Sequence, residues 1–409
     1  MSTVTTLQSM HAWKGLASAR PSKITFALGV AVVTLWVNMV LVFFPSQPIP
    51  GGDFMVFYTF GALARAGNWA AQYDWGAFHQ LQVALVPTSA NYLYAPTYPP
   101  LAPVLYLPFA WTSFVPAFAC WAATAAAAYT WLMDRVASSC LVLRRRDVLL
   151  GSLIFPGFIA LILMGQTTVW PLFGFVTGWL ALERGRPMLA GVLFSLIAVK
   201  PHFGLGLALV LLFSRSWTTI AGVLAGLVLQ GALSLIVCGP DAISAYLTTT
   251  LAMASNPAAL EPTDTRHTHA LLAALSTLMP QSAAFVTWLV LATGIGWMTA
   301  RFWRANTRWT IRMAALLLAS VLISPHVLVY DLVLLAPAFF WLLDDGFVTG
   351  RRATGLGALV LAAILVLPIA RVGGVPLTLP LMIWLLWRCR HAMEPLEKET
   401  TRTATTLQT

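Results

Sequence analysis

Long apolar runs, separated by short segments that often carry arginine, follow one another along almost the whole 409-residue chain. A helix that spans a bilayer needs about 20 consecutive, mostly apolar residues, and many of these runs approach that length. The composition agrees, because 59% of the residues are hydrophobic and 9% are charged, whereas a soluble domain carries about 25% charged residues. The chain is therefore predicted to be an all-α polytopic membrane protein and not a soluble globular one.

The apolar runs predict about twelve transmembrane helices, near residues 24–44, 113–133, 148–164, 167–183, 187–199, 202–214, 217–238, 284–303, 311–323, 327–343, 353–370 and 374–388. Four of these are short. The pair 187–199 and 202–214, and the pair 311–323 and 327–343, could each be one long helix broken at Lys200-Pro201 or at Ser324-Pro325. Helix breaks at membrane depth are tolerated only where protein or water satisfies the freed backbone groups, so both breaks indicate a candidate site.

The basic residues predict the orientation. With the N-terminus inside, all but four of the 24 Lys and Arg residues fall on the cytoplasmic side, the exceptions being Arg65, Lys200, Arg266 and Arg371. The net charge of +10 is thus read as a topology signal and not as a nucleic-acid surface. The first apolar run is too long for a signal-peptide core, so we expect it to remain as a span.

We therefore expect a cytoplasmic segment over residues 1–23, one transmembrane domain over 24–390 and a disordered cytoplasmic tail over 391–409. Two long outer loops, about 45–112 and 239–283, would face the periplasm or exterior of the inner (plasma) membrane. Short helices over 54–66 and 242–253 are expected to lie in the membrane interface. The four cysteines are not placed to form a disulfide framework.

Asp53 is a candidate catalytic carboxylate in the first outer loop, in the segment Gly51-Gly52-Asp53-Phe54. Ionisable residues at the edge of a membrane are costly and indicate function by default. Aspartate is also a preferred N-cap of a helix, so a plain cap of the helix that follows is the alternative.

Lys200 is the sole lysine between the terminal segments, and it stands beside the helix break together with His202. A buried ammonium suits a phosphate group, while a lysine that reaches the lipid headgroups is the alternative. Ser324-Pro325-His326 repeats this pattern, and Asp331 follows closely enough either to orient the His326 ring or to neutralise Lys200. A structural His-Asp pair is the alternative there, and Gly165-Gln166 on its own indicates a turn between two spans.

Tyr94 and Tyr98 belong to a proline-rich stretch that could line a groove for a sugar or a lipid chain, or could form an interfacial aromatic belt. In the second outer loop, His267 and His269 lack companions at metal-ligand spacing, so a solvated loop or an acceptor contact is expected and a zinc site is not.

No nucleotide-binding loop, HExxH or GxSxG motif is present in the sequence.

Taken in order, a series of motifs over about residues 50–335 resembles glycosyltransferase family 87: Asp53-Phe54 with Tyr58, Gly67, Tyr73-Asp74, Tyr94, Tyr98-Pro99-Pro100, Gly165-Gln166, Arg186-Pro187, Ala190-Gly191, Lys200-Pro201, Ser324-Pro325-His326 and Tyr330-Asp331. The resemblance implies a GT-C type fold and an inverting transfer of a hexose, most often mannose, from a polyprenyl-phosphate donor. The acceptor would be a glycolipid or polysaccharide outside the cytoplasm. It also implies that Asp53 is the general base and that Lys200 and His326 face the donor phosphate.

Asp331, His202, Gln166, Tyr58, Tyr94 and Tyr98 are expected to be supporting residues. The second outer loop departs from the family, because it has Arg266-His267-Thr268-His269 where many members have an Asn-x-Ser-like stretch, and His267 and His269 are candidate acceptor contacts there. No metal or other cofactor and no nucleic acid is expected. A secondary transporter is the alternative function, because about twelve spans with broken helices are also typical of transporters. A lipid-linked oligosaccharide polymerase or ligase is a third reading, although the outer side carries only three arginines.

Overall fold

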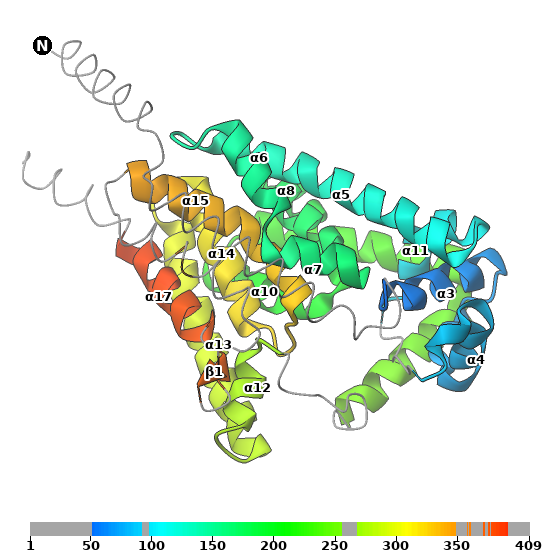
Figure 1. Cartoon of the computed structure of the whole chain (residues 1–409). Coiled ribbons are helices and arrows are strands. Elements are labelled where there is room, and N and C mark those ends of the chain that lie inside the picture. The colour runs from blue at the N-terminus through cyan, green and yellow to red at the C-terminus, as the bar shows by residue number, and fades with distance from the viewer. Residues whose placement is uncertain are drawn as a thin grey trace, which may run out of the picture.

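The structure is a computed structural model that describes residues 51–91, 98–255, 268–348 and 378–391, and the shorter pieces 358, 360, 371–372 and 375–376. The predicted span 24–44, most of 353–370, the segment 1–23 and the tail beyond residue 391 lie outside the described residues. The described chain is almost entirely helical, as predicted, and Figure 1 shows its helices packed into one bundle.

Short 3₁₀ helices (η) connect many of the α-helices. In chain order the elements are α3 (Phe54–Arg65), η2 (Ala70–Tyr73), α4 (Trp75–Leu85), η3 (Pro87–Ser89), η4 (Ala102–Leu105), η5 (Leu107–Trp111), α5 (Phe114–Ser139), α6 (Arg145–Leu153), α7 (Pro156–Met164), α8 (Val169–Glu183), α9 (Pro187–Phe194), η6 (Ser195–Val199), η7 (Pro201–Phe203), α10 (Gly204–Phe213), α11 (Trp217–Ser255), α12 (Leu271–Ser276), α13 (Gln281–Arg304), α14 (Trp309–Ile323), η10 (Val329–Leu334), α15 (Leu335–Val348) and α17 (Thr378–His391). The strands β1 (Arg371–Val372) and β2 (Val375–Pro376) pair antiparallel.

Three described helices are long and apolar enough to cross a membrane: α5, the part of α11 over Trp217–Ala252, and α13. A fourth span is possible if α6 and α7, which meet at a bend of 45°, cross together. Several other predicted spans are short apolar helices or are divided into pieces, because proline interrupts them. The number of twelve spans therefore remains a prediction.

Both predicted helix breaks are present. Before Pro201 the backbone of Lys200 leaves the helical region, with φ −129° and ψ 81°, because proline disfavours the helical conformation in the residue before it. After α14 ends at Ile323, the chain is not helical again until η10 begins at Val329. Each break places its polar residues at the end of an apolar helix.

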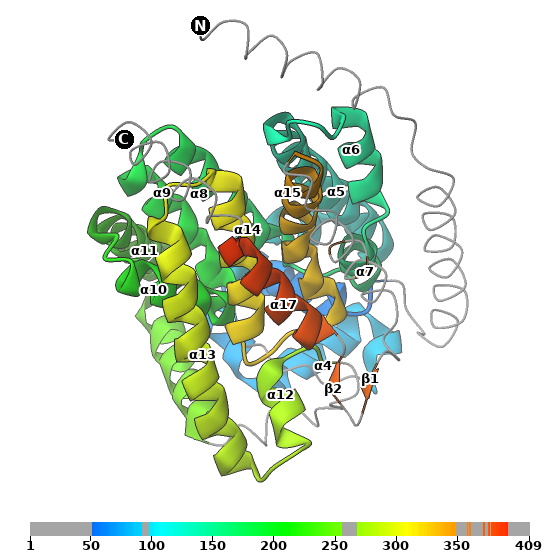
Figure 2. The same cartoon turned by 90° about the vertical axis from the view of Figure 1, so that its left-hand side faces the viewer.

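The helix α14 forms the centre of the bundle and is buried along nearly its whole length. Figure 2 shows α17 lying across it, with α13 and α15 on either side. A helix that is apolar on all sides is expected to be buried in this way. The packing of α14 fixes the position of the break that follows it.

The helix α3 corrects one expectation, because it lies in the protein interior and not in the membrane interface. Most of its side chains are buried, and a Cβ on Gly61 would lie 2.5 Å from the carbonyl oxygen of Tyr106. The other predicted loop helix, 242–253, continues α11 beyond a kink at Gly239, where φ is +81°. Close packing of α3 against η4 and η5 thus holds Asp53, the residue before α3, inside the protein.

Candidate active site

The Asp53 turn is attached to the end of α7. The backbone N–H of Gly51 donates to the Leu163 carbonyl (3.0 Å) and that of Asp53 to the Met164 carbonyl (2.9 Å). The Asp53 side chain occupies the N-cap position of α3 but makes no capping hydrogen bond. Its carboxylate is buried and accepts a hydrogen bond of 2.7 Å from Nε2 of Gln166. The plain-cap interpretation of Asp53 is therefore wrong.

The turn between α7 and α8 presents Gln166. The helix α7 ends at Gly165, whose left-handed conformation (φ +75°) is one that glycine adopts without strain. A Cβ at this position would lie 2.5 Å from the Cβ of Phe54, so the turn also approaches the start of α3 closely. On its own, Gly165-Gln166 indicated only a turn, and the resemblance added Gln166 as a supporting residue; in the structure the turn aims Gln166 at Asp53.

Lys200 donates three hydrogen bonds, one to each of three side chains. Its Nζ lies 3.1 Å from Oε1 of Gln166, 3.0 Å from Oγ1 of Thr168 and 2.8 Å from Oδ1 of Asp331. The ammonium also lies 4.7 Å from the centroid of the Tyr330 ring, within the range of a cation–π interaction. Because the side chain is buried and paired with Asp331, a lysine that reaches the lipid headgroups is excluded.

Asp331 neutralises Lys200, which is one of the two roles that the sequence left open. The carboxylate is fully buried and also accepts from the hydroxyl of Thr168 (2.6 Å) and from the backbone N–H of Leu328 (3.0 Å). A buried charge needs such partners, because an unpaired one is costly.

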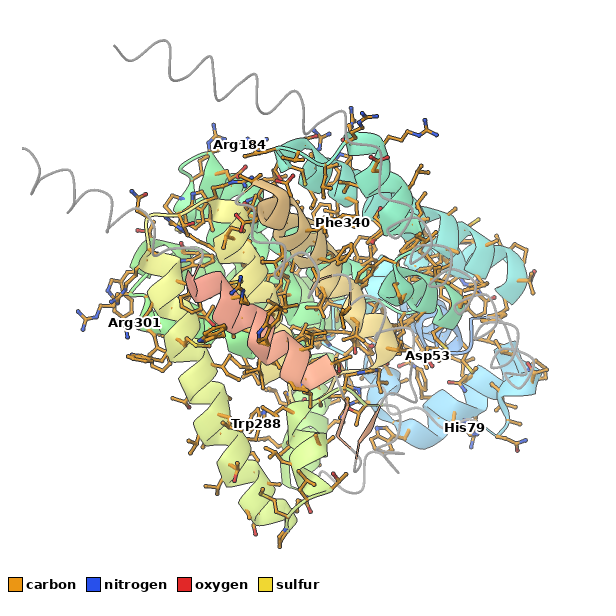
Figure 3. All side chains as sticks on the ribbon, turned by 60° about the vertical axis from the view of Figure 1, so that its left-hand side comes forward. Asp53, His79, Arg184, Trp288, Arg301 and Phe340 are labelled. Carbon is orange, nitrogen blue, oxygen red and sulfur yellow. The ribbon has the colours of Figure 1, made fainter. Side chains whose placement is uncertain are left out.

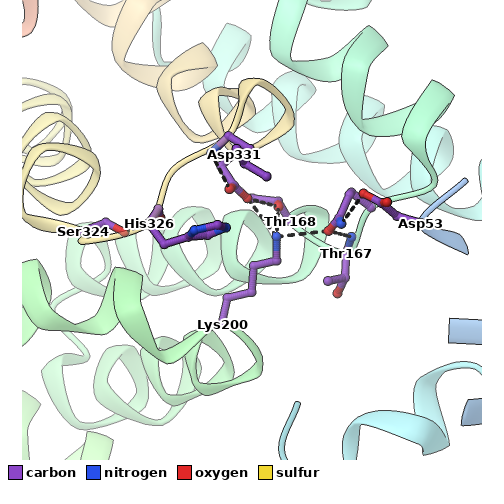
Figure 4. A network of polar contacts seen from close by, with 9 residues as sticks. Asp53, Thr167, Thr168, Lys200, Ser324, His326 and Asp331 are labelled. Atoms are coloured by element: carbon purple, nitrogen blue, oxygen red, sulfur yellow. Dashed lines mark hydrogen bonds and ion pairs between the residues drawn. The ribbon is translucent and has the colours of Figure 1, made fainter. Parts of the chain in front are cut away.

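These contacts join Asp53, Gln166, Lys200, Thr168 and Asp331 into one continuous network, which Figure 4 shows. Gln166 is the bridge, since its amide nitrogen donates to Asp53 and its amide oxygen accepts from Lys200. The network contains two carboxylates and one ammonium, and its members come from four separate places in the chain.

Two histidines lie beside this network. Figure 4 shows the His326 ring directed towards the Lys200 ammonium, and the Ser324 hydroxyl holds the loop by donating to the His326 carbonyl (2.7 Å). The ring of His202 lies 6.0 Å from that of His326, centroid to centroid, at 84°. Both helix breaks therefore bring a histidine to the same place.

Tyr98 also faces the site. Its ring packs against Phe57 with centroids 5.1 Å apart, and the negative charges of Asp331 and Asp53 act on its hydroxyl. Burial, foremost, raises the pKa of Tyr98 well above its usual value, and the neighbouring Tyr106 and then the two carboxylates add to this effect. The phenol is thus a hydrogen-bond donor across the physiological pH range.

The remaining sequence-predicted residues lie elsewhere or outside the described residues. Tyr58 donates to the Thr112 carbonyl (2.7 Å), which is a structural contact. The backbone of His269 donates to the Val327 carbonyl (2.7 Å), and its Nδ1 lies 3.1 Å from the Thr378 hydroxyl. This attaches the second outer loop to the loop of His326. Tyr94 and His267 fall outside the described residues.

Sequence reasoning missed Thr168 and did not connect Tyr330 with Lys200. The polar triplet Gln166-Thr167-Thr168 between two apolar runs was a usable signal for Thr168. Within the part of the chain that the structure describes, no group of three or more His, Cys, Asp or Glu side chains is placed to hold a metal ion. The arrangement offers a buried carboxylate as a base and, a few side chains away, a cation with two imidazoles that could stabilise an anion.

The model of one protein family, glycosyltransferase family 87, matches residues 97–325, which is more than half of the 409-residue chain. The matched region contains Gln166, Thr168 and Lys200, whereas Asp53 precedes it and His326 and Asp331 follow it. No curated protein and no solved structure matches the chain.

Proposed function

Because the chain belongs to glycosyltransferase family 87, we propose that it transfers a hexose, mannose in the first instance, from a polyprenyl-phosphate donor. The acceptor is a glycolipid or polysaccharide outside the cytoplasm. The single observation that supports this function best is the link from Asp53 through Gln166 to Lys200, because it joins a base to a cation in one buried site.

In the proposed reaction, Asp53 removes the proton from an acceptor hydroxyl while that oxygen attacks the anomeric carbon. The bond from the anomeric carbon to the phosphate oxygen breaks, and its electron pair remains on the phosphate. The result is one displacement, which inverts the anomeric centre. Asp331 is held by Lys200, Thr168 and the Leu328 backbone, which supports a reaction with one base and no carboxylate nucleophile.

The leaving phosphate needs charge stabilisation and no acid, because it is already a stable anion. Lys200 and His326 are the groups that we propose for this purpose. Gln166 donates a hydrogen bond to Asp53 and accepts one from Lys200. Binding of the donor at Lys200 is therefore expected to influence the orientation of the Asp53 carboxylate. His269 is attached to the loop of His326 through the Val327 carbonyl, and it remains our candidate for an acceptor contact in the second outer loop. The reaction as written uses no metal.

The same proposal includes a GT-C type membrane topology with about twelve spans, two large outer loops and both termini in the cytoplasm of an inner-membrane protein. The apolar helices and the family indicate a membrane protein. Figure 3 shows Arg184 at the upper edge and Arg301 at the left edge of the molecule, both in predicted cytoplasmic segments, and shows Asp53 and His79 on its right-hand side. This separation supports a site that faces the outer side. A secondary transporter is not favoured by the family.

The test is transfer of radiolabel from polyprenyl-phosphate mannose to lipid extract by the purified protein in detergent. Replacement of Asp53 by Asn is expected to reduce transfer by at least about 100-fold, which is the size of a general-base contribution. Asp74→Asn is the matched control, because Asp74 caps α4 through Oδ1 and asparagine caps a helix equally well.

Full transfer by the Asp53→Asn variant would contradict the base assignment. An absence of label with mannose, glucose and arabinose donors alike, while the protein remains folded, would contradict the donor class.

A further inference from the structure

The charges of the network do not suit an anionic ligand as they stand. Asp53 and Asp331 carry two negative charges against the one positive charge of Lys200, and all three hydrogens of that ammonium are already donated to side chains. A phosphate diester brings a further negative charge. It therefore needs additional hydrogen-bond donors and an additional positive charge close to Lys200.

His202 is placed to supply a further hydrogen-bond donor and a further positive charge. It lies two residues after Lys200, in η7. Its Nε2 atom is buried and has no hydrogen-bond partner among the residues that the structure describes. A buried polar nitrogen without a partner is unusual in a folded protein and calls for an explanation. The titratable or charged groups that act on its ring are Asp331, Lys200 and His326.

We propose that His202 is a second imidazole contact of the donor phosphate, and that the phosphate enters together with one proton, which His202 takes up. This inference rests on the proposed function. Nε2 of His202 donates a hydrogen bond to a phosphate oxygen, and the added proton offsets the excess negative charge of Asp53 and Asp331. A buried imidazole favours the neutral form until an anion stabilises the charged one, so the proton reaches His202 with the phosphate.

The proton is useful in the transfer step as well. When the bond to the anomeric carbon breaks, the diester becomes a monoester that gains one negative charge. The imidazolium stabilises that charge, while the proton from the acceptor hydroxyl goes to Asp53. His202 thereby acts on the leaving group, whereas Asp53 acts on the nucleophile.

Proton uptake fixes the sign of the pH dependence. If one proton binds to His202 with the phosphate, affinity rises as the pH falls, by up to about tenfold per pH unit. Lys200, Asp331, the Tyr330 ring and Thr168 face this place from the neighbouring elements. None of these four groups changes its charge in ordinary surroundings near neutral pH, so the dependence would come from the histidines.

The experiment is calorimetric titration of the full chain in detergent with farnesyl methyl phosphate, a diester that keeps a single negative charge between pH 6 and 8. Farnesol is the uncharged comparison. Titrations in two buffers of different ionisation enthalpy count the protons that are taken up. The variants are His202→Gln, His202→Asn and the matched control His79→Gln, which removes an outer-side imidazole in α4 away from the network.

We expect the native protein to take up close to one proton and to bind more weakly at pH 8 than at pH 6. Both His202 variants should bind at least about fivefold more weakly and take up less than half as much proton, while His79→Gln should behave as the native protein does. Unchanged affinity and proton uptake in the His202 variants would overturn the inference. An absence of proton uptake by the native protein would by itself overturn the inference. If the native protein bound the diester no better than farnesol, the proposed donor function itself would fail.

Discussion

Replacement of Asp331 by Asn should destabilise the protein because it leaves Lys200 as a buried charge without a counter-ion. Lys200 is 5% exposed and Asp331 is 0% exposed, and the Nζ to Oδ1 distance is 2.8 Å. Removing one partner of a buried ion pair costs about 3–5 kcal/mol. The asparagine also has to turn its amide nitrogen either towards the Lys200 ammonium or towards the Leu328 N–H, so one hydrogen bond is replaced by a contact between two donors.

The expected loss for Asp331→Asn is therefore about 4 kcal/mol in the free energy of unfolding. Lys200→Met should cost about 3 kcal/mol, because the carboxylate that remains still accepts from Thr168 and from the Leu328 backbone. The double variant removes both charges, so it should lose less than the sum of the two single losses by about 2 kcal/mol or more.

The assay is unfolding of the purified protein in micelles by a denaturing detergent, followed by tryptophan fluorescence. Arg145→Met, which breaks an exposed ion pair with Asp134, is the control and should leave stability unchanged. Additive losses in the double variant would refute the reasoning, because additivity means that the two charges do not stabilise each other in the folded protein.

Two further predictions concern the turn that carries Gln166. Gln166→Ala should lower the rate of transfer by about 10-fold to 100-fold and should also lower the free energy of unfolding by about 1.5–3 kcal/mol, because it removes hydrogen bonds to two buried charged groups. Single-turnover transfer by the folded variant measures the rate, and a native rate would show that Asp53 needs no orientation. Gly165→Ala should destabilise the protein by about 1–3 kcal/mol, since φ is +75° and the new Cβ would lie 2.5 Å from the Phe54 Cβ. Gly185→Ala, with φ +67° and no atom within 4 Å of a Cβ, should cost less in the same unfolding assay; equal losses would mean that the contact with Phe54 plays no part.

The sequence by itself determined the class of the protein and most of the candidate residues. Spanning segments depend on local hydrophobicity, and helix breaks depend on the local effect of proline, so neither needs knowledge of the fold. In a chain with 9% charged residues, Asp53, Lys200 and Asp331 also stand out among apolar neighbours. These features could be recognised without any contact being known.

The tertiary structure decided which residues act together. Gln166 lies 113 residues from Asp53 in the chain, and Lys200 lies 131 residues from Asp331. Whether Asp53 caps α3 or meets Gln166, and whether Asp331 reaches Lys200, depends on how α3, α7 and η10 pack. The same packing buries α3, which the sequence placed in the membrane interface, and turns Tyr58 towards Thr112. Local patterns fix the residues and the breaks, but hydrogen-bond partners distant in sequence are set only when the helices pack.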